Sequence, residues 1–149
     1  MKRIAVLTWF NRGRNYGQTL QAFALYCTLK KMGYECELLS YGKNGPRLSD
    51  EEINQLSGAK RELQMKFVAF IKQHIQYSIR LRDRESTERY LLENKFDVVL
   101  CGSDQIWNPF FSLDTVYFLD FDVPYKENVF FFLYCSDINI SAPLVLCQQ

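Results

Sequence analysis

The sequence is poor in the features that identify many metal sites and catalytic triads. It has a single histidine, His74, so a histidine-dependent triad would have to use it. His74 falls within a predicted amphipathic helix, where a helix-surface role is the ordinary one. The five cysteines contain no CxxC pair and no Cys/His cluster with metal-site spacing. We therefore predict reduced, structural thiols, no metal and no resident cofactor.

The chain also lacks an excess of charge of either sign. It has 18 basic and 17 acidic residues among 149, so no net field attracts nucleic acid. No apolar run approaches the ~20 residues of a membrane-spanning helix, and no signal peptide precedes the first apolar run. These absences predict a cytoplasmic protein with no nucleic-acid partner and no transmembrane segment. The oligomeric state stays open.

The apolar content that is present predicts one folded α/β domain. Hydrophobic residues make up 48% of the chain and aromatic residues 15%, which excludes a disordered protein. Arg3–Phe10 is typical of a buried strand, Gly17–Lys31 has helical spacing, and Glu35–Tyr41 is again strand-like. We expect Leu20 and Phe23 on the buried face of this helix. Strand, helix and strand in this order form a right-handed βαβ unit.

Later segments extend this pattern. We predict a loop or short capped helix within Asn44–Gly58, helices at Ala59–Arg82 and Thr87–Lys95, and strands at Phe96–Cys101, Tyr117–Phe121 and Val129–Cys135. Residues 1–122 then form a Rossmann-like parallel sheet with flanking helices. Residues 123–149 form a divergent apolar tail. If Phe96–Cys101 lies beside Arg3–Phe10, opposite Glu35–Tyr41, the winding reverses there and a crevice opens between the loops.

The loop from Arg12 to Gly17 is one candidate for this crevice. It precedes a helix whose free N–H groups and positive dipole end favour anions, and arginine can bind a carboxylate or phosphate bidentately. It matches neither GxGxxG nor the P-loop pattern, so a nucleotide site is disfavoured. Two interpretations stay open: direct anion binding, or a structural loop in which Asn15 caps the helix and Gly17 permits a tight turn.

The second candidate is the segment Gly102-Ser-Asp-Gln-Ile-Trp-Asn-Pro109. It places a carboxylate and two amides beside an indole ring, directly after a buried strand. Asp104 has the chemistry of an acid, a base or an orienting group, and Trp107 offers a face for a sugar. The alternative is a structural turn in which Asp104 caps a helix and Trp107 lies in the core.

Three segments resemble the polysaccharide pyruvyl transferase family. Asn15-Tyr-Gly-Gln-Thr-Leu-Gln-Ala-Phe-Ala-Leu25 is similar to that family's NYGAxLQAYAL opening. Gly102–Pro109 is similar to its GSDQxWNP segment, and Tyr117–Phe121 to the YFLDF that follows. The resemblance implies pyruvyl transfer from phosphoenolpyruvate to a sugar of a cell-surface polysaccharide. It also implies two Rossmann-like halves facing a cleft, as in GT-B glycosyltransferases.

The resemblance also implies site residues. Asp104 is the candidate catalytic acid/base or hydroxyl-orienting group. The candidate substrate-binding residues are Arg14, Asn15, Tyr16 and Gly17 at an anion edge, Gln105, Trp107 and Asn108 for the acceptor sugar, and Gln21, Gly102 and Ser103.

The chain departs from the family in its last part. Family members usually read SYAASFG after YFLDF, whereas this chain has Val129-Phe-Phe-Phe-Leu-Tyr-Cys-Ser136. The second Rossmann-like half is absent, so we expect a truncated member that is inactive alone. The alternative is a non-catalytic Rossmann-like domain with weak sugar or anion binding.

Overall fold

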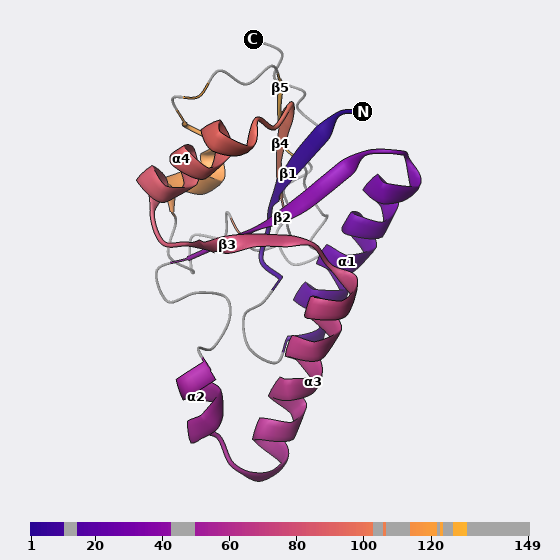
Figure 1. Ribbon diagram of the computed structural model, residues 1–149, viewed down its shortest axis with the longest axis vertical. Helices are drawn as coiled ribbons and strands as arrows, with labels where there is room; N and C mark the ends of the chain where they lie inside the picture. Colours follow the sequence, from indigo (N-terminus) through magenta and orange to yellow (C-terminus); the bar gives the residue numbers. More distant parts are fainter. Residues whose placement is uncertain are drawn as a thin grey trace, which may run out of the picture.

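The computed structural model describes residues 1–10, 15–42, 50–102, 106, 114–121, 123 and 127–130. In chain order, these residues form β1 (Arg3–Leu7), α1 (Tyr16–Lys31), β2 (Glu35–Tyr41), α2 (Asp50–Gln55), α3 (Gly58–His74), β3 (Tyr77–Leu81), α4 (Arg84–Asn94), β4 (Val98–Cys101), the 3₁₀ helix η1 (Thr115–Phe118) and β5 (Glu127–Phe130) (Figure 1).

The strands form one parallel sheet in the order β3-β2-β1-β4-β5. β1 is central, as predicted: Ile4 lies opposite Cys36 of β2 on one side and Val98 of β4 on the other. This order, with helices between the strands, is a Rossmann-like α/β arrangement. The predicted fold class of a parallel sheet with flanking helices is therefore confirmed.

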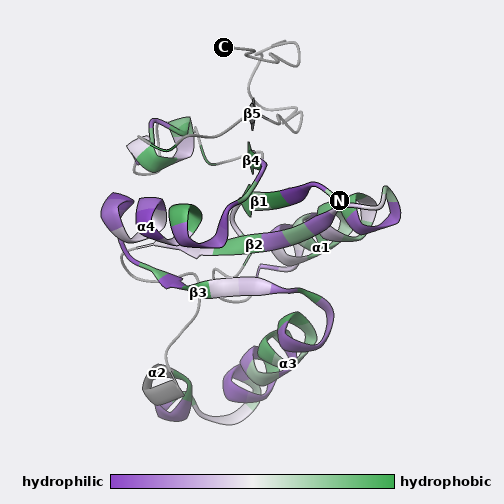
Figure 2. Ribbon diagram, turned by 45° about the horizontal axis from the view of Figure 1, so that its top comes forward, coloured by the Kyte–Doolittle hydropathy of each residue, from purple (hydrophilic) through white to green (hydrophobic). Residues whose placement is uncertain are grey.

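Helices cover both faces of the sheet, and alternation along β1 assigns the core to two layers. Ile4 and Val6 pack with residues of α1 and α3, including Ala22 and Ile71. Ala5 and Leu7 instead pack with residues of α4 and η1. Figure 2 shows α1 and α4 on opposite sides of the strands. A strand buried on both faces reads as a continuous apolar run, which explains the sequence of β1.

Helix α1 begins and ends where the sequence indicates, but its buried face differs from the prediction. Asn15 is the N-cap, and Gly33 follows the helix with φ +85°, a backbone conformation that glycine adopts readily. The buried residues of α1 are Thr19, Ala22 and Leu29, which are three and seven positions apart. Leu20, which we expected inside, is 55% exposed. The small Ala22 permits close approach of the helix to the sheet.

The predicted helix Ala59–Arg82 is wrong in its last part. α3 ends at His74, and Tyr77–Leu81 is the edge strand β3, parallel to β2. Ile75 and Ile79 continue the helical spacing of the apolar stripe, so periodicity did not reveal the change. Pairing with β2 decides it: the carbonyl oxygen of Gln76 accepts a 3.0 Å hydrogen bond from the N–H of Leu38.

Other predicted elements differ from the structure in type or in bounds; α4, for example, begins at Arg84 and not at Thr87. Tyr117–Phe121 is not a strand: Thr115–Phe118 form η1, which Asp114 caps, and Leu119 ends it with a left-handed φ of 54°. Strand β1 ends at Leu7, whereas we expected it to reach Phe10. The predicted strand Val129–Cys135 overlaps β5, which pairs with β4 from Glu127 to Phe130; residues 131–149 lie outside the described residues.

Candidate functional site

The candidate site lies where the sheet reverses its direction of winding. β1 pairs with β2 on one side and with β4 on the other. The N–H of Gly102, directly after β4, donates a 3.3 Å hydrogen bond to the carbonyl oxygen of Leu7 at the end of β1. From these adjacent ends the chain continues to α1 on one face and to η1 on the other. The structure therefore contains the topological switch point that the sequence predicts.

The structure describes part of the predicted site. Asn15, Tyr16, Gly17, Gln21 and Gly102 are placed, whereas Arg14, Ser103, Asp104, Gln105, Trp107 and Asn108 lie outside the described residues. Within the second motif, Ile106 is also placed, and its side chain is 1% exposed in the core on the α4 side. The strand ends that carry the two motifs are thus adjacent, and the roles of Asp104 and Trp107 stay predictions.

Asn15 caps the first turn of α1. Its Oδ1 accepts a 3.1 Å hydrogen bond from the N–H of Gln18, and its carbonyl oxygen accepts one from the N–H of Thr19. At Gly17, an added Cβ would lie 3.3 Å from Asn15 Oδ1, a tight contact. Gly17 is helical, so its function here is to make room for the cap and not to form a turn. The capping interpretation of Asn15 is confirmed.

Hydrogen bonds from polar side chains of α1 connect this helix to the residues that follow β1. Gln21 Nε2 donates a 3.4 Å hydrogen bond to Thr8 Oγ1, and Thr19 Oγ1 donates a 3.2 Å hydrogen bond to the carbonyl oxygen of Phe10. Thr8 is 4% exposed and Gln21 is half-buried. Gln21 was predicted to bind substrate, but its amide nitrogen has an internal acceptor. Thr8 and Thr19 were not selected from the sequence as residues of the site. Thr8 directly follows a strand, where this fold places its ligand sites, and that position was the available signal.

Tyr117 connects the ends of β1 and β4 from the other face. Trp9 Nε1 donates a 2.8 Å hydrogen bond to the Tyr117 hydroxyl oxygen. Cys101 Sγ lies 3.2 Å from the Tyr117 carbonyl oxygen, which accepts its hydrogen bond. Trp9 and Tyr117 are buried, with their ring centroids 6.4 Å apart in an edge-on arrangement. No local pattern in the sequence indicates this pair, because its members are 108 residues apart.

The end of β2 joins the same cluster. The Tyr41 hydroxyl donates a hydrogen bond to Asp114 Oδ2, and the Tyr41 and Tyr117 rings meet edge to face with centroids 5.5 Å apart. Burial, followed by this hydrogen bond to the carboxylate, raises the pKa of Tyr41 far above its usual range. Tyr41 therefore stays neutral at ordinary pH. These residues form a cluster at the carboxyl ends of β1, β2 and β4.

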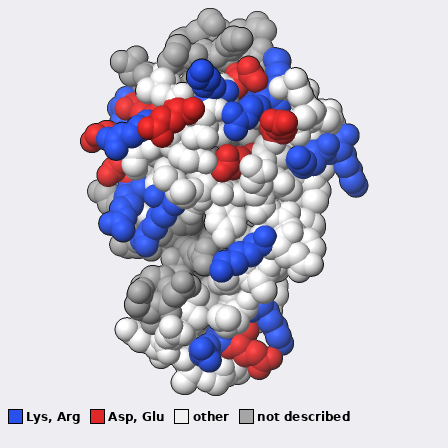
Figure 3. Space-filling model, in the orientation of Figure 1, with Lys and Arg blue, Asp and Glu red and all other residues white. Residues whose placement is uncertain are grey.

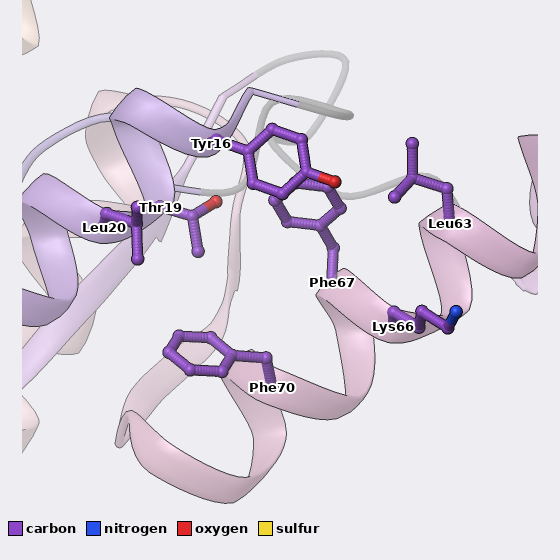
Figure 4. A pocket seen from close by; sticks show the side chains of 7 residues that line it. All are labelled: Tyr16, Thr19, Leu20, Leu63, Lys66, Phe67 and Phe70. Carbon is purple, nitrogen blue, oxygen red and sulfur yellow. The ribbon is translucent and has the colours of Figure 1, made fainter.

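Tyr16 belongs to a groove between α1 and α3. Its ring centroid lies 4.7 Å from that of Phe67, and its side chain is 59% exposed. Figure 4 shows the Tyr16 ring, from α1, next to the Phe67 ring, from α3. Tyr16 was predicted at an anion edge. The structure places its backbone in the first turn of α1 and its ring in this apolar groove.

Chemically, the described part of the site offers hydrogen-bond donors more than charge. Because Asn15 satisfies the N–H of Gln18, the N–H groups of Tyr16 and Gly17 are the first-turn donors that make no hydrogen bond to another described residue. They point out of the positive end of a helix of 16 residues, the environment that favours a carboxylate or phosphate.

Figure 3 shows acidic and basic residues interspersed around α4, on the face it displays.

Comparison of the chain with family models, curated proteins and solved structures found no match. Among the described residues, no group of three or more His, Cys, Asp or Glu side chains could hold a metal ion. In the same part of the chain, no helix has the length and apolar character needed to cross a membrane.

Proposed function

We propose that this chain forms one wall of a cleft in which a pyruvyl group passes from phosphoenolpyruvate to a saccharide. The observation that carries the proposal is the adjacency of Leu7 and Gly102. It brings together the strand ends that precede the two segments resembling the polysaccharide pyruvyl transferase family. The Rossmann-like strand order supports a GT-B-like half, in which such loops face the donor and the acceptor.

The reaction needs three kinds of group. Protonation of the phosphoenolpyruvate methylene makes the adjacent carbon electrophilic, and one sugar hydroxyl adds to it and loses its proton. Phosphate then leaves, and a second hydroxyl adds and loses its proton to close the ketal. We assign the proton transfers to Asp104, the anionic donor to Arg14 and the N-terminus of α1, and the acceptor sugar to Gln105, Trp107 and Asn108.

Binding of phosphoenolpyruvate to the chain tests the anion edge. Titration followed by amide NMR is expected to shift the signals of Tyr16, Gly17 and Gly102, with a Kd of about a millimolar, or ~4 kcal/mol. Arg14→Ala should weaken this binding. Arg89→Ala provides the matched control, because Arg89 lies on α4 and pairs with Glu85. Unshifted signals at roughly ten times that concentration would rule out the assigned anion edge.

The transfer step needs a separate assay. One α/β wall does not exclude water or hold the donor against the acceptor, and that positioning supplies much of the rate. We therefore expect no phosphate release and no pyruvyl ketal when the chain alone meets phosphoenolpyruvate and a panel of hexoses. A second α/β unit would be needed for turnover. Turnover that Asp104→Asn abolishes would contradict the inactivity and support Asp104; turnover that Asp104→Asn leaves unchanged would contradict both assignments.

The alternative is a non-catalytic domain that binds a sugar or an anion weakly. Its supporting observation is that the described residues form a single sheet with a single switch point. It predicts binding in the titration and no transfer when a second α/β unit from a pyruvyl transferase is supplied.

A further inference from the structure

An apolar groove lies between the first half of α1 and the middle of α3. Its volume is about 300 Å³, and it is lined by Tyr16, Thr19 and Leu20 from α1 and by Leu63, Lys66, Phe67 and Phe70 from α3. In Figure 4 the rings of Tyr16, Phe67 and Phe70 lie on both helices and frame the hollow. The volume is at the lower end of small-molecule pockets, enough for one or two fused rings.

The groove is not closed by the packing of the two helices. Leu20 is 55% exposed and Tyr16 59% exposed, although both side chains lie beside the apolar residues of α3. Single exposed apolar residues are ordinary on a protein surface. Here, however, they surround one hollow, and such a patch is a common mark of a binding site.

The polar groups at the groove favour an anion. Lys66 is the one charged residue in the described lining, and Thr19 Oγ1 already donates to the Phe10 carbonyl oxygen. Lys66 Nζ lies 2.7 Å from Glu62 Oε1, in a pair whose side chains are 70% and 68% exposed. An exposed pair of this kind contributes little to stability, so a ligand anion can compete with Glu62 for the ammonium group.

We propose that this groove binds a small aromatic carboxylate, with its ring between Tyr16 and Phe70 and its carboxylate at Lys66. Aromatic side chains contact a ring edge to face or offset, and the tilt of 54° between Tyr16 and Phe67 leaves ring faces and edges available. The proposal does not depend on pyruvyl transfer, because it uses the ring of Tyr16 and residues of α3 that the proposed reaction does not involve.

The test uses 1-naphthoate as the probe and 1-naphthalenemethanol as its neutral counterpart, with binding followed by amide NMR. Both should shift signals of α1 and α3, and naphthoate should bind more tightly. Leu20→Glu places a carboxylate in the groove and should weaken naphthoate binding at least about tenfold. Ile79→Glu is the matched control: Ile79 is 70% exposed on β3, and its replacement should leave both affinities unchanged.

Lys66→Gln separates the charge from the apolar contact. It should weaken naphthoate binding about two- to fivefold and leave naphthalenemethanol binding unchanged, because an exposed charge contributes modestly. Leu20 and Lys66 are exposed, so both variants should keep the circular dichroism spectrum of the parent chain. Equal binding of the two probes would overturn the carboxylate preference. Sedimentation showing a dimer that Leu20→Glu dissociates would assign the groove to a second copy of the chain instead.

Discussion

The indole Nε1 of Trp9 donates a 2.8 Å hydrogen bond to the hydroxyl oxygen of Tyr117, and both side chains are buried. Trp9 follows the central strand, and Tyr117 lies in η1, beyond the second motif. This contact therefore joins η1 to the residues that follow β1, at the carboxyl edge of the sheet.

Replacing Tyr117 with phenylalanine tests this connection. The change removes the acceptor of a buried indole N–H, which costs about 1–3 kcal/mol in the free energy of unfolding. Denaturant unfolding followed by fluorescence measures this loss. Tyr26→Phe is the control, because the Tyr26 hydroxyl makes no hydrogen bond to another described residue; it should change stability by less than about 0.5 kcal/mol. Equal effects of the two variants would show that the hydrogen bond is dispensable.

Substitutions at Asn15 separate capping from anion binding. Asn15→Ala removes the acceptor of the Gln18 N–H and should lower the free energy of unfolding by about 0.5–2 kcal/mol. Asn15→Asp keeps a capping oxygen and adds a negative charge at the helix N-terminus, so it should preserve stability. The same charge should weaken phosphoenolpyruvate binding in the NMR titration. If Asn15→Asp binds the donor as tightly as the parent chain, the anion does not lie at this helix end.

Tyr41 should make stability fall at alkaline pH. Burial and the Asp114 hydrogen bond raise its pKa in the folded chain, whereas the unfolded chain has the usual value near 10. Above about pH 10 the unfolded state loses this proton first, so the contribution of Tyr41 is present below that pH and declines above it. Comparison of the parent with Tyr41→Phe cancels the other titrating groups. The stability difference between them should shrink from pH 9 to pH 11; a constant difference would contradict this account.

The described cysteines should differ in reactivity. Cys36 and Cys101 are buried, and Cys27 is half-buried. Burial raises the pKa of Cys36 to about 11 and that of Cys101 above its usual range. At pH 8 only about one thousandth of Cys36 is then thiolate, the reactive form.

In a background with Cys135→Ser and Cys147→Ser, a thiol reagent should modify Cys27 first in the native chain. All three remaining thiols should react after denaturation without reductant. A lower count would mean that a disulfide has formed, contrary to the reduced thiols predicted from the sequence and the free cysteines of the described part.

Local signals in the sequence determined the βαβ start of the fold. Glu35–Tyr41 is a strand with the predicted bounds, and α1 begins within one residue of its predicted start. In both cases, the spacing of the apolar residues matches a single type of secondary structure. The helix is also followed by Gly33, whose positive φ glycine adopts readily. The buried strand before Gly102 was equally clear, and the structure confirms its expected place beside β1.

Only the tertiary structure decided β3, η1 and the contacts among Trp9, Tyr41 and Tyr117. Tyr77–Leu81 keeps the helical spacing of the residues before it, and its strand conformation comes from pairing with β2. Tyr117 is β-prone, but its bonds to Trp9 and Cys101 hold it in a 3₁₀ turn at the sheet edge. Sequence patterns report local periodicity, whereas these contacts join residues far apart in the chain. Their free energy outweighs local preference only when the sheet is assembled.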